Sequence, residues 1–128
     1  MPPRAYGERK IERLLGINSR AVELMASVAM GILAAHWLLV MWFTLFRLGS
    51  LRFLRLHYSA SLGVDWIGAW WMIFIFPAFG LALFFVNAYF AGALSKRYRL
   101  FSPVIMSLTI FLEVVTAIGG VAALLLNG

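Results

Sequence analysis

The sequence predicts an all-α integral membrane protein whose three transmembrane helices cover residues 22–46, 66–94 and 103–126. Of its 128 residues, 63% are hydrophobic and 12% are charged, which is too few charges to cover the surface of a soluble domain. Each predicted span exceeds the roughly 20 residues that cross a bilayer core. Because a backbone in lipid must satisfy its own hydrogen bonds, each span should be helical. No repeat or linker divides the chain, so residues 1–128 are expected to form one domain.

The N-terminal segment, residues 1–20, is basic and is predicted to lie at the cytoplasmic face. Ile11, Leu14 and Leu15 fall on one side of a short amphipathic helix, which would rest on the membrane surface. A frayed basic tail is the alternative. The loop before the third span carries further basic residues that would meet lipid headgroups, Lys96, Arg97 and Arg99. Because fewer basic residues lie between the first two spans, the positive-inside rule predicts N-in, C-out.

Residues 47–65 are predicted to form an outer loop. Its apolar residues would keep it at the outer interface, with Arg52 and Arg55 facing lipid headgroups. Gly63 allows a turn near the end of the loop, and Asp65 is expected to cap the free N–H groups of the second helix.

The second span begins with tryptophan. Three of these residues are expected to form an aromatic belt at headgroup depth: Trp66, Trp70 and Trp71. Pro77 follows within the same predicted helix, so a kink near its middle is expected.

The third span is predicted to start with Ser102 as its cap and Pro103 in its first turn. Small, polar or flexible residues share one face of this helix: Ser102, Met106, Thr109, Glu113, Thr116, Ala117 and Gly120. Apolar residues share the opposite face: Ile105, Leu108, Leu112, Val115 and Ala122. The first face is therefore expected to pack against protein and the second against lipid.

Two ionisable residues lie within the spans. His36 and Glu113 are placed at depths of roughly 18 and 15 Å by the rise of an α-helix, so both should lie near the midplane. A carboxylate at that depth is costly, so Glu113 should be protonated or paired. We expect it to contact His36, Asn87 or a partner chain, with Thr109 and Thr116 nearby. A structural hydrogen bond and a proton pathway are both open.

The stretch LHYSASLGVDWIG resembles the loop of the SdpI-type immunity proteins of bacteria and of short three-helix bacterial membrane proteins. His57 and Asp65 keep the spacing of the SdpI-type motif, whereas Gly63 lies one position late and Ser59 stands where that family tends to have Asn. The proline that usually precedes the histidine is absent. The resemblance implies a bacterial inner-membrane protein with an immunity or signalling role.

Enzymatic chemistry finds little support in the sequence. The chain has no cysteine, which excludes disulfides and thiolate catalysis. His57 and Asp65 lack the third ligand that a zinc site needs, so no metal is predicted, and no cofactor is. Basic residues flank apolar spans, so lipid phosphate is favoured over nucleic acid as their partner.

These observations favour a non-enzymatic structural or accessory subunit that packs through its third helix and its small-residue patches against other integral membrane subunits or itself. One alternative is an immunity or signalling protein that recognises a toxin or ligand through the outer loop. A second is an oligomer that conducts protons or ions through Glu113.

Overall fold

The computed structural model describes residues 19–47, 51–95, 98 and 100–128. Its elements follow in chain order: α2 (Ser19–Phe46), β1 (Phe53–Ser59), β2 (Gly63–Ala69), the 3₁₀ helix η1 (Trp70–Phe74), α3 (Ile75–Ser95) and α4 (Phe101–Leu125). The amphipathic helix expected within residues 1–20 lies outside the described residues, and so do Lys96, Arg97 and Arg99.

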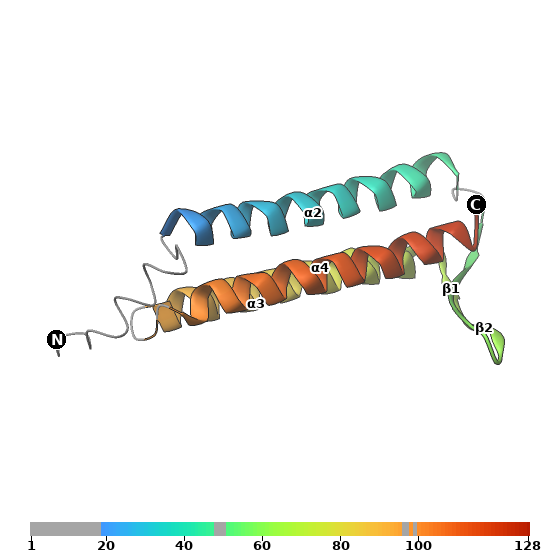
Figure 1. Ribbon diagram of the computed structural model, residues 1–128. Helices are drawn as coiled ribbons and strands as arrows, with labels where there is room; N and C mark the ends of the chain where they lie inside the picture. The colour runs from blue at the N-terminus through green and yellow to red at the C-terminus, as the bar shows by residue number, and fades with distance from the viewer. Residues whose placement is uncertain (1–18, 48–50, 96–97, 99) are drawn as a thin grey trace, which may run out of the picture.

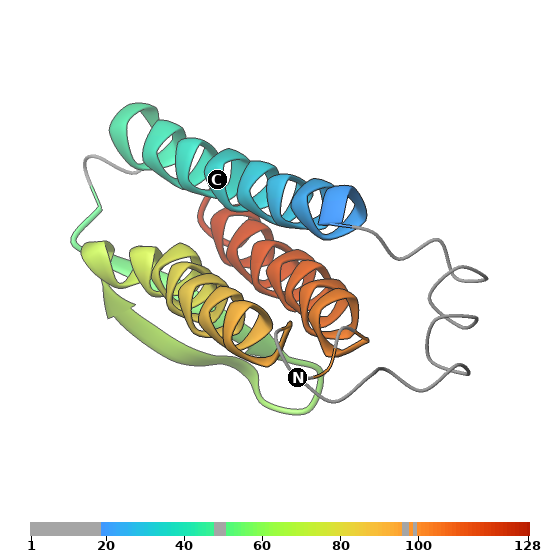
Figure 2. The same ribbon diagram turned by 90° about the vertical axis from the view of Figure 1, so that its left-hand side faces the viewer.

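The three long helices lie side by side, and α4 packs against both α2 and α3 (Figures 1 and 2). Helices α2 and α4 run in the same direction, and α3 runs the opposite way between them in the chain (Figure 1). All three are long and apolar enough to cross a membrane, as expected.

The prediction of an all-α chain is wrong over residues 53–69, where β1 and β2 form an antiparallel hairpin. The reason is the alternation in β1, which buries Leu54 and Leu56 and exposes the residues between them. Gly63, with φ 72°, supplies the left-handed conformation at the start of β2. The predicted outer loop is therefore largely an ordered hairpin.

The second helix starts later than predicted. Asp65 lies within β2 and does not cap a helix, because the chain stays extended to Ala69 and then passes through η1. Pro77 is the third residue of α3, in the first turn, where its missing N–H has no intrahelical role. It therefore helps to begin the helix rather than bending its middle.

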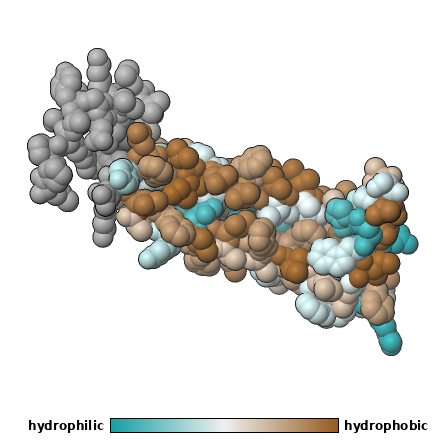
Figure 3. Space-filling view, turned by 90° about the horizontal axis from the view of Figure 1, so that it is seen from below, coloured by the Kyte–Doolittle hydropathy of each residue, from teal (hydrophilic) through white to brown (hydrophobic). Residues whose placement is uncertain are grey.

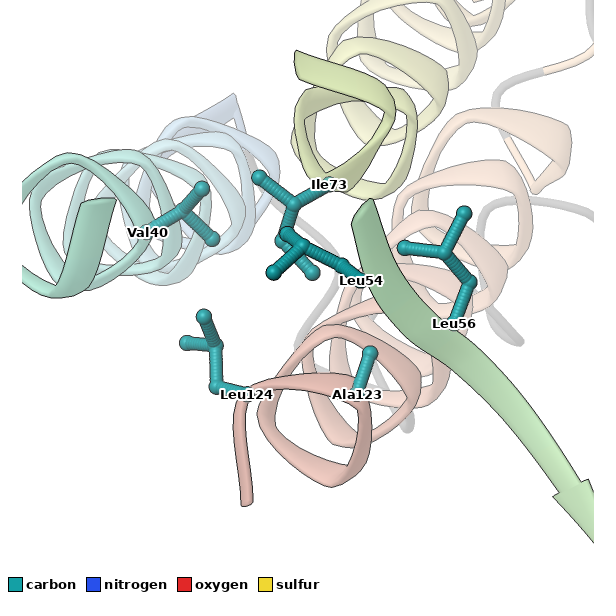
Figure 4. Close-up of a cluster of buried hydrophobic side chains, with 6 residues drawn as sticks. All are labelled: Val40, Leu54, Leu56, Ile73, Ala123 and Leu124. Atoms are coloured by element: carbon teal, nitrogen blue, oxygen red, sulfur yellow. The ribbon is translucent and has the colours of Figure 1, made fainter. Parts of the chain in front are cut away.

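Two apolar clusters form the core. The first lies at the hairpin end, where β1 covers the ends of the helices (Figure 4): Val40, Leu54, Leu56, Ile73, Ala123 and Leu124. The second lies further along the bundle: Ala29, Leu33, Phe84, Ala91 and Met106. We call them the hairpin-end cluster and the far cluster.

The burial of α4 follows the division between its two faces. Eight residues of α4 are buried, and five of them belong to its small and polar face: Ser102, Met106, Thr109, Glu113 and Gly120. Ser102 does not cap α4, which already begins at Phe101; its hydroxyl instead donates to the carbonyl oxygen of Ala91 on α3, at 2.8 Å. Most of this face therefore packs within the chain, against α2 and α3.

Candidate functional site

Glu113 lies in the interior of the bundle with 0% of its surface exposed. Its Oε2 atom points at Gly80 of α3, where an added Cβ would lie only 2.6 Å from that oxygen. Leu33 of α2 reaches the same point, since its Cδ1 atom would lie 3.2 Å from that Cβ. All three helices therefore enclose the carboxyl group, and a glycine makes the space for it.

His36 of α2 occupies a similar position against α4. Only 3% of its surface is exposed, and its Nε2 atom lies directly over Gly120. A Cβ at that glycine would overlap the imidazole ring, so the close approach of α2 and α4 depends on Gly120. Each buried ionisable side chain thus faces a glycine on a neighbouring helix.

The polar atoms of these side chains have no hydrogen-bond partner among the described residues. This holds for both carboxyl oxygens of Glu113, both ring nitrogens of His36 and the Nδ2 atom of Asn87. The direct contact expected between Glu113 and His36 or Asn87 is therefore not made as a hydrogen bond. Buried polar atoms are nearly always paired in folded proteins. These five unpaired atoms therefore single out His36, Asn87 and Glu113 as candidate functional residues.

The three residues follow one another along the bundle. On α4, Gly120 lies two turns beyond Glu113, about 10 Å nearer the hairpin, and this places the His36 ring above the carboxyl group. On α3, Asn87 lies two turns from Gly80 in the opposite direction. The order from the far end to the hairpin is therefore Asn87, Glu113 and His36.

The two threonines expected beside Glu113 do not solvate its carboxyl group. Thr109 donates to the carbonyl oxygen of Ile105 at 2.8 Å, and Thr116 donates to the backbone carbonyl of Glu113 at 3.0 Å. Both hydroxyls thus bond to the backbone of their own helix, which is the common way to satisfy such groups in an apolar helix.

The hairpin holds a second polar pair. His57 Nδ1 and Asp65 Oδ1 lie 2.6 Å apart across the two strands. The hydrogen bond from His57 lowers the pKa of the Asp65 carboxyl group. Ser59 accepts a hydrogen bond from the backbone N–H of Leu62 at 3.2 Å and so closes the turn that Gly63 completes. The motif residues are thus brought together as parts of one hairpin.

The predicted interface residues gather at the same end of the molecule. Trp66 belongs to β2, whereas Trp70 and Trp71 belong to η1, and all three are exposed. Arg52 and Arg55 are exposed beside them. Within the described residues there is no group of three His, Cys, Asp or Glu side chains that could hold a metal ion.

Asn127 is a structural residue that the sequence did not reveal. Its Oδ1 accepts from the backbone N–H of Arg55 at 2.9 Å, and its Nδ2 donates to the Arg55 carbonyl at 2.7 Å. The same Nδ2 donates to the Ala123 carbonyl at 2.7 Å. The side chain therefore pairs with β1 as a neighbouring strand would and fastens the hairpin to the end of α4. An amide side chain directly after a long apolar helix is the feature of the sequence that could have indicated this role.

In comparisons with known proteins, no family model, no curated protein and no solved structure matches the chain.

Proposed function

We propose that the chain is an integral membrane protein with its N-terminus inside, which acts as a non-enzymatic accessory subunit of a membrane assembly. Hydrophobic residues cover most of the length of the helices, and hydrophilic residues gather at the hairpin end (Figure 3). This distribution suits three helices in lipid and a hairpin at the membrane surface. A bacterial inner membrane is the location that the loop resemblance supports.

The surface that supports an accessory role lies on α2. Ser27, Gly31 and Ala35 follow one another at four-residue spacing and are all exposed. A Cβ at Gly31 would meet nothing within 4 Å, so the backbone is open there. Small residues at this spacing let a second helix come close, and close packing drives association between helices in lipid. This small-residue stripe is the observation that carries the proposal.

The face of α4 cannot serve this purpose, since its small residues already pack inside the chain. Ser27 is suited to a protein contact, because its hydroxyl is satisfied by the Glu23 carbonyl at 2.9 Å and needs no further partner. We therefore assign the contact with another membrane subunit to α2.

The mass of the particle extracted in mild detergent tests this assignment. We expect a fixed complex that exceeds the 14.4 kDa of one chain, and its loss in Gly31→Leu. Gly92→Leu is the matched control, because a Cβ at Gly92 of α3 also meets nothing within 4 Å. A single-chain particle from the native protein, or equal effects of both changes, would contradict the proposal.

A second candidate function is recognition of a toxin or ligand by the hairpin. Two features support it: the strands of the hairpin are paired, and its tip is exposed. Leu62 at the tip is 77% exposed, and the His57–Asp65 pair lies on the accessible part of the strands. The likeness to immunity proteins points the same way. Cells that express a matching toxin should survive with the native chain and die when the tip residue is changed in Leu62→Asp. Equal survival would argue against recognition at the tip.

A further inference from the structure

We propose that the hairpin rests on the lipid beside the bundle and touches it with one face of its outer half. This lipid face is formed by Tyr58, Val64 and Trp66, which would reach the headgroup and upper acyl region of the leaflet at the hairpin end. The inference rests on the proposed insertion of the three helices, and it adds a lipid contact made by the strands.

The first argument is the direction of the hairpin. It runs across the direction of the long helices, and its tip projects past the side of α3 and α4 (Figures 1 and 2). The candidate membrane span that contains α3 begins at Trp70, directly after β2 ends at Ala69. In a bilayer crossed by the three helices, the hairpin would therefore lie along the membrane surface, at the depth where this span begins.

The second argument is that one face of the hairpin is already turned towards the bundle. Leu54 and Leu56 of β1 are buried in the hairpin-end cluster. Gly68 of β2 lies opposite Leu54 in the register, and a Cβ at Gly68 would lie 2.7 Å from the Cδ1 atom of Leu56. These three residues therefore define the face that covers the helix ends.

The same face continues outward along both strands. Because side chains alternate between the two faces of a strand, Tyr58 follows on β1, and Trp66 and Val64 follow on β2. Tyr58 and Val64 are partners in the register, in agreement with this alternation. The register shifts around His57, but this residue still contacts Asp65 at 2.6 Å, which places both on the opposite face.

The third argument is the chemistry of this outer half. Tyr58, Val64 and Trp66 are all exposed, although the inner half of the same face is buried on the bundle. Tyrosine and tryptophan are enriched at membrane–water interfaces, because each ring is apolar while its O–H or N–H group can meet headgroups or water. The lipid face therefore carries the side chains that a leaflet surface favours.

The opposite face of the hairpin has a different composition. It carries the exposed Arg55 and the His57–Asp65 pair, and two exposed apolar residues, Phe53 and Ile67, share it. A lipid contact on this face would take a charged group and a polar pair out of water, which is costly. We therefore expect this face to meet water.

Spin labels on single introduced cysteines test the contact, because the chain has none of its own. In vesicles of phosphatidylcholine and phosphatidylglycerol, a label at Val64→Cys should collide with oxygen, which dissolves in lipid, and be shielded from a water-soluble nickel complex. A label at Ile67→Cys should show the reverse, although Ile67 is the more exposed of the two in the isolated chain, 63% against 37%. Phe85→Cys, an exposed position in the middle of α3, reports whether the helices lie in lipid.

The three labels separate the possible failures. Nickel access at Val64 equal to that at Ile67, with Phe85 shielded, would overturn the lipid contact of the hairpin and leave the insertion of the helices standing. Nickel access at Phe85 would overturn the proposed insertion as well. Shielding of Val64 from both oxygen and nickel would assign this face to a protein contact, which would also overturn the inference.

A charge added to either face of β2 gives a matched pair of variants. Trp66→Asp should raise the nickel access of the Val64 label several-fold, because a carboxylate is costly in lipid and would lift the strand from the surface. Ile67→Asp adds the same charge to the opposite face and should leave that access unchanged. Equal nickel access in the two variants would contradict the proposed orientation. The readings from the single cysteines do not depend on either variant.

Discussion

At the scale of single residues, two glycines decide whether polar side chains fit inside the bundle. Gly80 faces the carboxyl group of Glu113, and Gly120 faces the ring of His36. Neither adopts an unusual backbone conformation, since the one glycine with positive φ among the described residues is Gly63. What matters at these helix positions is the missing side chain. The missing side chain of each glycine leaves room for a polar group where two helices approach each other closely.

The contrast between Gly120 and Gly31 gives the first prediction. Gly120→Ala should destabilise the fold by about 1–3 kcal/mol, as overpacking does, because the new methyl group would overlap the His36 ring. Gly31→Ala should be neutral or stabilising, since its site is open and alanine favours the helix. Thermal unfolding in detergent compares the two. Equal melting temperatures would show that the ring moves aside at no cost.

The sequence predicts part of the buried site and misses part. The interior side of Glu113 follows from its small and polar neighbours. Counting residues along the helices places His36 and Glu113 nearly level, whereas His36 faces Gly120, which lies two turns from Glu113. The lack of a direct hydrogen bond could not be foreseen, because it depends on the relative height of α2 and α4. That height is fixed by contacts such as His36 on Gly120, which no local pattern reveals.

At the scale of elements, the hairpin shows how a long apolar run conceals a change of structure. Residues 66–94 have the composition of one helix, and the tryptophans at their start suit a membrane interface. The chain nevertheless stays extended as far as Ala69, because β1 offers a paired strand and buries Leu54 and Leu56 on the helix ends. The alternation of apolar and polar residues over Phe53–Leu56 is visible in the sequence. The second strand is harder to recognise, because its residues run directly into the apolar residues of η1 and α3.

Asn127 should hold the hairpin in place. Asn127→Ala removes three hydrogen bonds, two to Arg55 and one to Ala123. A neutral hydrogen bond contributes about 0.5–1.5 kcal/mol, so the hairpin should loosen while the helices persist. Amide hydrogen exchange should accelerate in β1 and stay unchanged in the middle of α4. Asn127→Asp keeps the acceptor and loses both donated bonds. Its exchange rate in β1 should therefore lie between those of the native chain and of Asn127→Ala. Unchanged protection of β1 in the alanine variant would show that the clamp is dispensable.

The His57–Asp65 pair should make the hairpin sensitive to acid. Because the pKa of Asp65 is lowered in the folded chain, the carboxylate favours the hairpin at pH values above the ordinary range of an aspartate. This contribution is lost as the pH falls through the lowered pKa and the carboxylate gains a proton. NMR signals of β1 and β2 should therefore shift or broaden in acid.

Asp65→Asn is the control for this acid response. It cannot ionise, so its hairpin signals should not change over the same acidic range, although the hairpin should be less ordered at neutral pH. An identical acid response in the native chain and in the variant would assign the change to another group.

At the scale of the whole molecule, the two ends of the bundle differ. The hairpin, the exposed tryptophans and the C-terminus share one end, where the hairpin-end cluster closes the core (Figures 1 and 4). Glu113 and His36 lie between this cluster and the far cluster. The three helices of the bundle enclose the Glu113 and His36 side chains between them.

The orientation of the molecule in a membrane is the last prediction. The basic residues near the N-terminus and before α4 favour an inside location for both, which puts the hairpin outside. Because the chain has no cysteine, one introduced thiol reports on one position. Ser61→Cys, in the exposed turn of the hairpin, should react with an impermeant thiol reagent in intact cells. Ser95→Cys, at the end of α3, should react only after the cells are opened. Labelling at Ser95 with none at Ser61 in intact cells would invert the orientation, and the hairpin would then face the cytoplasm.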